Sequence, residues 1–284
     1  MKKLLVFATL LAAALAVTAY ITCEASNLWG KRIKGSDRIV TRTLAAPDFD
    51  AVSAARGTRV VLSDKSDVIR IDANDNLIDH VVVEEKEGIL RITIDPKIVN
   101  VSNADITVTV PARNGAIRSL EASSAACILS DTELHADRAN IDASSAAKIK
   151  VAYQANECVT KASSAARIDA VLRTTSCSFD ASSAAEIEAE ISSADCSANA
   201  SSAAKIEFEG STHNLTAETS SAARIDAGEL TADNAVVKAS SGSGIQVGCR
   251  QSLKAHASSG ASIRYSGECE IDAETSSGGS IRRK

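Results

Sequence analysis

Aromatic residues are scarce in this chain. Only 3% of its 284 residues are aromatic, although 45% are hydrophobic, and much of that share is alanine. Aromatic side chains usually supply much of the core of a large globular domain. A chain this poor in them must bury its surface in another way, and stacking thin repeated layers is one such way.

The chain also lacks a strong charge of either sign and a long apolar run in its body. The formal net charge is −5, and no basic stripe with interleaved aromatics is present, so nothing favours a nucleic-acid partner and none is expected. No segment after the first residues is apolar enough to span a membrane. Contact with a membrane is therefore expected only through a lipid anchor.

The amino terminus is typical of an export signal, predicted at residues 1–23. Lys2 and Lys3 precede an apolar run, Leu4–Val17, of the length of a signal-peptide core. Cleavage after Val17-Thr18-Ala19 is one possibility. The other is a lipobox-like Tyr20-Ile21-Thr22-Cys23, which would place a lipid on Cys23, although Thr22 is an imperfect match.

A short repeat organises the second half of the chain. The string Ser-Ser-Ala-Ala-x-Ile, with Ser-Ser-Gly variants at the end, recurs every 18 to 21 residues, and the fifth residue after each first serine is always isoleucine. This period is too short for a helical solenoid but fits one coil of a β-helix. The nine isoleucines are Ile128, Ile149, Ile168, Ile187, Ile206, Ile225, Ile245, Ile263 and Ile281.

Alternation around each serine pair predicts one strand before the corner and another after it. Small or apolar residues stand one, three and five positions before the first serine, and polar residues such as Asp180 and Lys238 stand between them. The variable remainder of each coil should hold a loop or a third strand. We therefore predict a right-handed parallel β-helix of about nine rungs at 119–284, roughly 40 Å long.

Residues 38–118 lack the repeat. Runs such as Ile89–Ile94 and Ile106–Val110 alternate like strands and are separated by turn signals such as Glu87-Gly88. They predict a β-rich domain that leads into the β-helix and caps its first coil. Residues 24–37 are predicted to be a linker.

These features resemble the putative auto-transporter adhesin, head GIN domain family, known mainly from Bacteroidetes. The resemblance rests on the leader, on Gly30–Gly35, on Pro47–Val52 and on the Ser-Ser rungs, and it runs from about residue 38 to the end. It implies a β-helical fold and export, and it supplies no catalytic residues. The chain ends on a rung, at Ile281–Lys284, so self-transport through a barrel of its own is not expected.

An acidic column is the most suggestive candidate site. Asp169, Glu188, Glu207 and Asp226 recur on successive rungs, about 5 Å apart, which is near the separation used by retaining glycosidases and could suit calcium. The column two residues earlier on the same face contains the cations Lys148, Arg167, Lys205 and Arg224. A solvated ladder of charge pairs is the favoured interpretation.

The serines and cysteines have simpler interpretations. None of the four histidines recurs with the serines, so the serines are expected to satisfy backbone groups at the corners rather than act as nucleophiles. Cys158, Cys177 and Cys196 should stack inside three rungs as core residues, because an in-line stack is not a tetrahedral zinc site. Cys249 and Cys269 could pair, which the spacing leaves open.

The function expected from these features is that of an exported structural or interaction protein, adhesin-like, in the periplasm, outer membrane or cell surface. We expect no enzyme activity, metal or cofactor, and an envelope or surface partner, either protein or glycan. The alternative is a pectin-lyase-like polysaccharide-processing enzyme. It requires acidic, basic and aromatic side chains clustered in one groove, and the charges here alternate along the whole rod.

Overall fold

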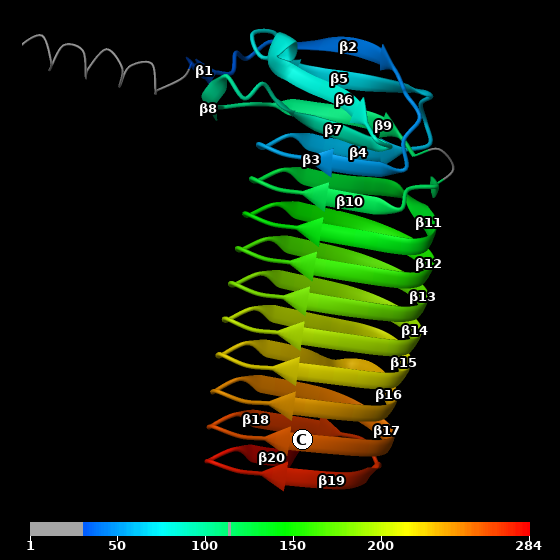
Figure 1. Ribbon diagram of the computed structural model, residues 1–284, viewed down its shortest axis with the longest axis vertical. Helices are drawn as coiled ribbons and strands as arrows, with labels where there is room; N and C mark the ends of the chain where they lie inside the picture. Colours follow the sequence, from blue (N-terminus) through cyan, green and yellow to red (C-terminus); the bar gives the residue numbers. More distant parts are fainter. Residues whose placement is uncertain (1–30, 113–114) are drawn as a thin grey trace, which may run out of the picture.

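The computed structural model describes residues 31–112 and 115–284 and consists almost entirely of strands (Figure 1). A continuous sheet of stacked coils winds down the molecule, as predicted, so the β-solenoid of about nine turns is confirmed. The predicted signal peptide and Cys23 lie outside the described residues. No helix in 31–112 or 115–284 has the length and apolarity needed to cross a membrane.

Each middle coil is one long strand that bends around the far edge of the stack. Parallel pairing to the neighbouring coils continues through the bend, which corrects the expectation of a loop or a separate third strand. Longer coils absorb their extra residues as shifts in register, for example between Leu129 and Glu133. The strands are β11 (Cys127–Ala143), β12 (Lys148–Ala162), β13 (Arg167–Ala181), β14 (Glu186–Ala200), β15 (Lys205–Thr219), β16 (Arg224–Ala239) and β17 (Gly244–Ala257).

The repeated isoleucines form one column in strict register. Ile168 lies beside Ile187, which lies beside Ile206, and the same pairing runs from Ile128 to Ile281. All of them are buried except Ile281, which is half-buried. The remaining space in the interior is filled by small residues and by a few large ones, such as Tyr153 and the edge-to-face pair Phe179 and Phe208.

The serine corners are held by backbone groups. In each corner the second and third residues have positive φ, as for Ser183 (φ 53) and Ala184 (φ 59), a pattern of type I′ turns. The fourth residue donates its N–H to the first carbonyl, and the third donates to the corner of the next coil, as Ala184 does to Ser202. The expected serine hydroxyl contacts to the backbone are therefore wrong for most described corners; Ser243, which accepts from the N–H of Ser240, is an exception.

The stack begins earlier than the serine motif. Strand β3 (Ala51–Ala54) pairs with β10 (Ser119–Ala122), and β4 (Arg59–Ser63) pairs with β11, both in parallel. Between them, Arg56 and Gly57 adopt the same two positive φ values as a serine corner, and the Gly57 N–H donates to Ser124. One hydrophobic core runs across the predicted domain boundary between residues 118 and 119. That the two parts are separate domains therefore stays a prediction.

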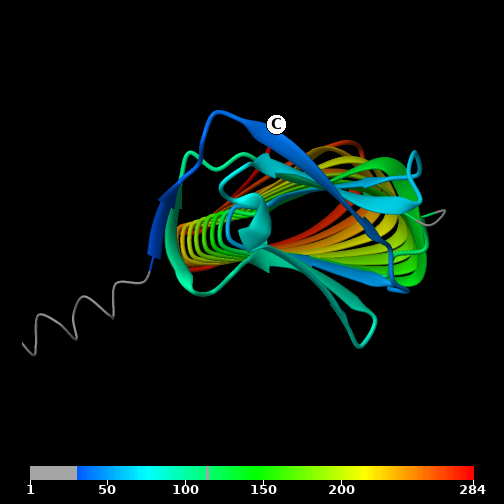
Figure 2. The same cartoon turned by 90° about the horizontal axis from the view of Figure 1, so that it is seen from above.

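A cap covers the amino-terminal end of the stack. Strands β7 and β9 add one more parallel layer on β3 and β4, and β2 and β5 then cross over it in antiparallel pairing (Figures 1 and 2). The predicted linker ends earlier than expected, because Lys31–Lys34 form β1 beside β8. The cap elements are β1, β2 (Ile39–Ala45), β5 (Val68–Asn74), the 3₁₀ helix η1 (Ile78–His80), β6 (Val81–Lys86), β7 (Ile89–Ile94), β8 (Ile98–Ser102) and β9 (Ile106–Pro111).

The opposite end of the described stack is uncovered. The chain continues from β17 into β18 (Ser262–Ser266), β19 (Glu270–Thr275) and β20 (Ser280–Arg283). Strand β18 pairs with β17 on one side and β20 on the other, whereas β19 and β20, which form the last coil, have a neighbour on one side only. The inward positions of β19 are therefore exposed, and Ile271 is 42% exposed. The two ends of the solenoid thus differ in how their core is protected.

Candidate functional site

The acidic column lies on the outer face just after the serine corners. The register places Asp169, Glu188, Glu207 and Asp226 side by side on β13 to β16, as the sequence predicts. Successive side chains of a strand point to opposite faces. Each of these carboxylates stands between the buried isoleucine and the next inward residue, so it points outward. The column therefore follows directly from the repeat.

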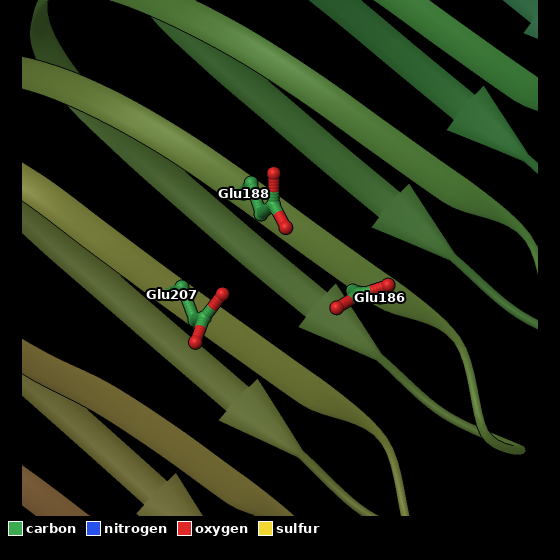
Figure 3. Close-up of side chains that lie close together, drawn as sticks. All are labelled: Glu186, Glu188 and Glu207. Atoms are coloured by element: carbon green, nitrogen blue, oxygen red, sulfur yellow. The ribbon is translucent and has the colours of Figure 1, made fainter.

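Three carboxylates gather at the centre of this column. Glu186, Glu188 and Glu207 each offer an oxygen, and these oxygens lie within 4.8 Å of one another. Figure 3 shows Glu188 and Glu207 projecting from neighbouring coils, with Glu186 nearer the corner. Glu186 stands at a position where four other coils carry a cation, and for that reason the sequence pattern did not place it in the site.

Two cations already occupy the space between these carboxylates. The Arg167 guanidinium contacts Asp169 at 3.1 Å, Glu186 at 2.7 Å and Glu188 at 2.6 Å. The Lys205 ammonium contacts Glu207 at 2.6 Å and Glu186 at 3.7 Å. A metal ion would have to displace both, so these residues fit a charge network better than a cation site.

The charge network keeps both cations protonated. Burial lowers the pKa of Arg167, but the hydrogen bond that it donates to Asp169 and the charges of Asp169, Glu186 and Glu188 outweigh this effect and raise that pKa. The hydrogen bond to Glu207 raises the pKa of Lys205. The predicted neutralisation is therefore present at Arg167 and Lys205, whereas Lys148 and Arg224 make no ion pair within the described chain.

A second acidic column lies beside the first and has no counterions. Glu190 pairs in register with Glu209, and Glu209 with Glu229. All three are exposed, and none makes an ion pair in the described part of the chain. Sequence reasoning missed this column because the one-residue-longer coil places Glu229 one position later than the fixed spacing predicts.

Both columns line one groove of about 910 Å³ that runs along the stack from Ser130 to Lys284. Its carboxylates are Asp169, Glu188, Glu190, Glu207, Glu209, Asp226 and Glu229, and its cations are Lys150 and Lys284. The formal charge of these lining side chains is −5, from seven carboxylates and two ammonium groups. Like charges on adjacent strands repel, so this face favours a cationic contact.

The groove lacks the features of a sugar-cleaving cleft. Phe208 is the aromatic residue in its lining, and that ring is buried at 2% exposure, so no aromatic platform faces the groove among the described residues. The central carboxylates are tied to Arg167 and Lys205 rather than poised as an acid and a base. The arrangement can bind charged groups more readily than it can transfer protons.

One histidine lies near the serine corners. His256 lines a depression of about 330 Å³ with Ser201, Ser220 and Ser240, and its Nδ1 lies 3.4 Å from a Glu274 oxygen. No serine hydroxyl in the described chain forms a hydrogen bond with this ring. The nucleophile–base contact that a catalytic serine requires is therefore not formed here.

The cysteine column is part of the core. Cys158, Cys177 and Cys196 stack in register and are all buried. Burial raises the pKa of the Cys158 thiol to about 12, so it stays neutral. No histidine joins the column in the described residues, and the in-line arrangement fits packing rather than zinc.

Comparison with known proteins agrees with this architecture. Residues 48–190 and 159–269 match the model of the family described as putative auto-transporter adhesin, head GIN domain. This protein belongs to that family. The resemblance stated from the sequence is thereby confirmed, and a search of curated proteins finds no match.

Several solved structures share the fold. A putative adhesin from Parabacteroides merdae ATCC 43184 has a TM-score of 0.66 at 17% identity, covering 89% of this chain and 99% of that one. A putative adhesin from Parabacteroides distasonis ATCC 8503 has a TM-score of 0.70 at 15% identity, and a putative lipid binding protein from the same organism 0.63 at 18%. Both cover 89% of this chain and 100% of their own.

Proposed function

We propose that this head GIN domain protein is an exported, non-catalytic binding rod of the adhesin type, and that the acidic groove is its contact surface. The observation that carries this proposal is the uncompensated column of Glu190, Glu209 and Glu229 beside the neutralised one. Stacked like charges weaken the isolated rod, and a cationic partner would relieve them. The partner is a basic protein segment or an amine-bearing glycan of a cell envelope.

The family supports an adhesin-like role, and the groove offers nothing that favours the polysaccharide-processing alternative. One relative is described as a lipid binding protein. In this chain the inward positions of successive coils are filled by buried side chains, so a lipid tail would have to bind outside the solenoid. Export is supported by the leader-like residues 1–23 and stays part of the proposal.

The test is binding of the purified chain to arrayed glycans and to basic peptides at low and at physiological salt. We expect the triple variant Glu190→Gln, Glu209→Gln, Glu229→Gln to lose at least about tenfold in affinity, with a smaller loss at higher salt. The matched control is Glu84→Gln, Glu121→Gln, Asp180→Asn, which removes three charges elsewhere. Equal binding by both variants would remove the groove from the proposal, and glycan cleavage dependent on Glu188 or Glu207 would restore the enzyme alternative.

Location needs a separate experiment. We propose that the leader is either cut before the body or ends in a lipid on Cys23. Mass measurement and fractionation of the chain, with and without Cys23→Ala, distinguish the two. A lipid-sized mass that disappears in the variant indicates an anchored protein, and a soluble product of both chains indicates a free rod.

A further inference from the structure

Two cysteines outside the charge network lie where the uncovered last coil meets the coil before it. Strands β19 and β20 have a neighbour on one side only, and Ile271 of β19 is 42% exposed. Cys269 directly precedes β19, and Cys249 lies on β17 in the preceding coil. The pair therefore joins the least supported coil to the body of the stack.

The backbones of the two segments approach closely at this point. Gly248 pairs with Ser266, and Ser252 pairs with Glu270, so the stretch that ends at Cys269 lies against the stretch that begins at Cys249. A Cβ on Gly267 would lie 2.0 Å from the Cys249 carbonyl oxygen, which only glycine permits. Glycine at this position thus brings the two cysteine-bearing segments together.

The two thiols also interact. Burial, together with the hydrogen bond and charge interaction with the Cys269 thiol, raises the pKa of Cys249 to about 11. Cys249 is 2% exposed and its thiol donates to the Ser252 carbonyl at 3.0 Å, whereas Cys269 is half-buried. One thiol of the pair is therefore open to a reagent, and the other is held beside it.

We propose that Cys249 and Cys269 form a disulfide in the exported protein, and that this bond fastens the last coil to the stack. This proposal rests on the export that is part of the proposed function, because disulfides persist in compartments outside the reducing cytosol. The stacked Cys177 and Cys196 are enclosed in the core and stay thiols.

The bond forms by thiol–disulfide exchange with a disulfide donor, either glutathione disulfide or a dithiol oxidase. The Cys269 thiolate attacks one donor sulfur, forms a mixed disulfide and releases one donor thiol(ate). Cys249 then loses its proton to solvent, attacks the Cys269 sulfur and releases the second donor thiol(ate). Two cysteine thiols are oxidised and one donor disulfide is reduced to two thiols.

Tryptic mapping of the full chain tests the bond directly. Cleavage after Lys238, Arg250, Arg264 and Arg282 places Cys249 and Cys269 on separate peptides. After incubation of the native protein with glutathione disulfide, with free thiols then blocked, we expect these two peptides to travel as one linked species that separates on reduction. Cys177→Ala/Cys196→Ala is the matched control and should leave this species unchanged.

The mechanical role has its own measurement. Reduction of the linked protein should speed amide exchange in β19 and β20 by roughly tenfold or more and leave β13 unchanged. In Cys269→Ser, reductant should have no effect. Free Cys249 and Cys269 after incubation with the donor would overturn the proposal. A bond that forms in vitro but is absent from protein taken from its host would instead contradict the proposal that the protein is exported to an oxidising compartment.

Discussion

At the scale of single residues, the fold depends on three kinds of position. The isoleucine column is enclosed between neighbouring coils, where a side chain of fixed shape meets the same side chain above and below. Certain glycines lie where a neighbouring carbonyl leaves no room for a Cβ. A third kind, the serine corner, tolerates non-glycine residues at positive φ in coil after coil.

Removing one isoleucine from the column should be costly. Ile187→Ala deletes a fully buried side chain between Ile168 and Ile206, and we expect it to lower the free energy of unfolding by about 2–5 kcal/mol. Chemical denaturation measures this. Asp180→Ala, on the exposed face of the preceding coil, is the control and should change stability by at most about 0.5 kcal/mol.

Two glycines with positive φ should respond differently to alanine. At Gly210 (φ +102) a Cβ would lie 2.2 Å from the Ile191 carbonyl oxygen, whereas at Gly260 (φ +73) it would meet nothing within 4 Å. We expect Gly210→Ala to destabilise by more than about 2 kcal/mol and Gly260→Ala by about 1 kcal/mol, since alanine occupies the corresponding corner position in six other coils. Equal thermal shifts in the two variants would contradict this.

At the scale of the element, the long curved strand is the unit of both fold and surface. Each strand contributes one row to every column, so a charge on one strand lies beside whatever residue occupies the same position on its neighbours. The same geometry produces a neutralised column at Arg167 and Lys205 and an uncompensated one at Glu190, Glu209 and Glu229. Whether a column is compensated depends on which strands carry cations.

Arg167 should contribute modestly and in a salt-dependent way. Arg167→Gln leaves Asp169, Glu186 and Glu188 facing one another without their shared counterion, and because Arg167 is 39% exposed we expect a loss of only about 0.5–1 kcal/mol. The loss should shrink in high salt, where charges are screened. Arg224→Gln is the control from the same column, and its thermal unfolding should not change with salt beyond that of the unaltered protein.

At the scale of the whole molecule, the described part of the solenoid is covered at one end and uncovered at the other. The cap of β2 and β5 covers the core at the start of the stack, and Ile69 and Ile71 in it are fully buried. At the other end, Ile271 and its neighbours face outward. Stability in a stack of coils is approximately a sum of nearest-neighbour terms, so the coil with one neighbour is the weakest.

Amide hydrogen exchange should therefore vary along the stack. We expect β19 and β20 to exchange fastest, and β3 and β4 to be nearly as protected as β13 and β14 because the cap supplies their second neighbour. The reduced protein is the state to measure, so that no covalent link masks the effect. Uniform protection from β3 to β20 would mean that the stack unfolds as a single cooperative unit.

Most of the architecture could be predicted from particular residues. The interval between isoleucines, the small inward residues and the polar outward ones specify a coil, a face and a register. The corner at Arg56 and Gly57 could not be found in this way, because the turn needs two positive φ values rather than serine itself. Likewise, a fixed spacing does not predict the position of Glu229, because its coil is longer and shifts it along the strand.

The sequence by itself determined that this chain forms stacked β coils with buried isoleucines and alternating charges on the outside, since a repeat that must bury one face has few other solutions. Only the tertiary structure decided which charges find partners, that each coil is one bent strand, and that the first coil lies within the region that lacks the repeat. It also brought Cys249 to Cys269 at the open end. These features depend on contacts between coils, where a shift of one residue changes which side chains face each other, and a linear pattern does not contain that information.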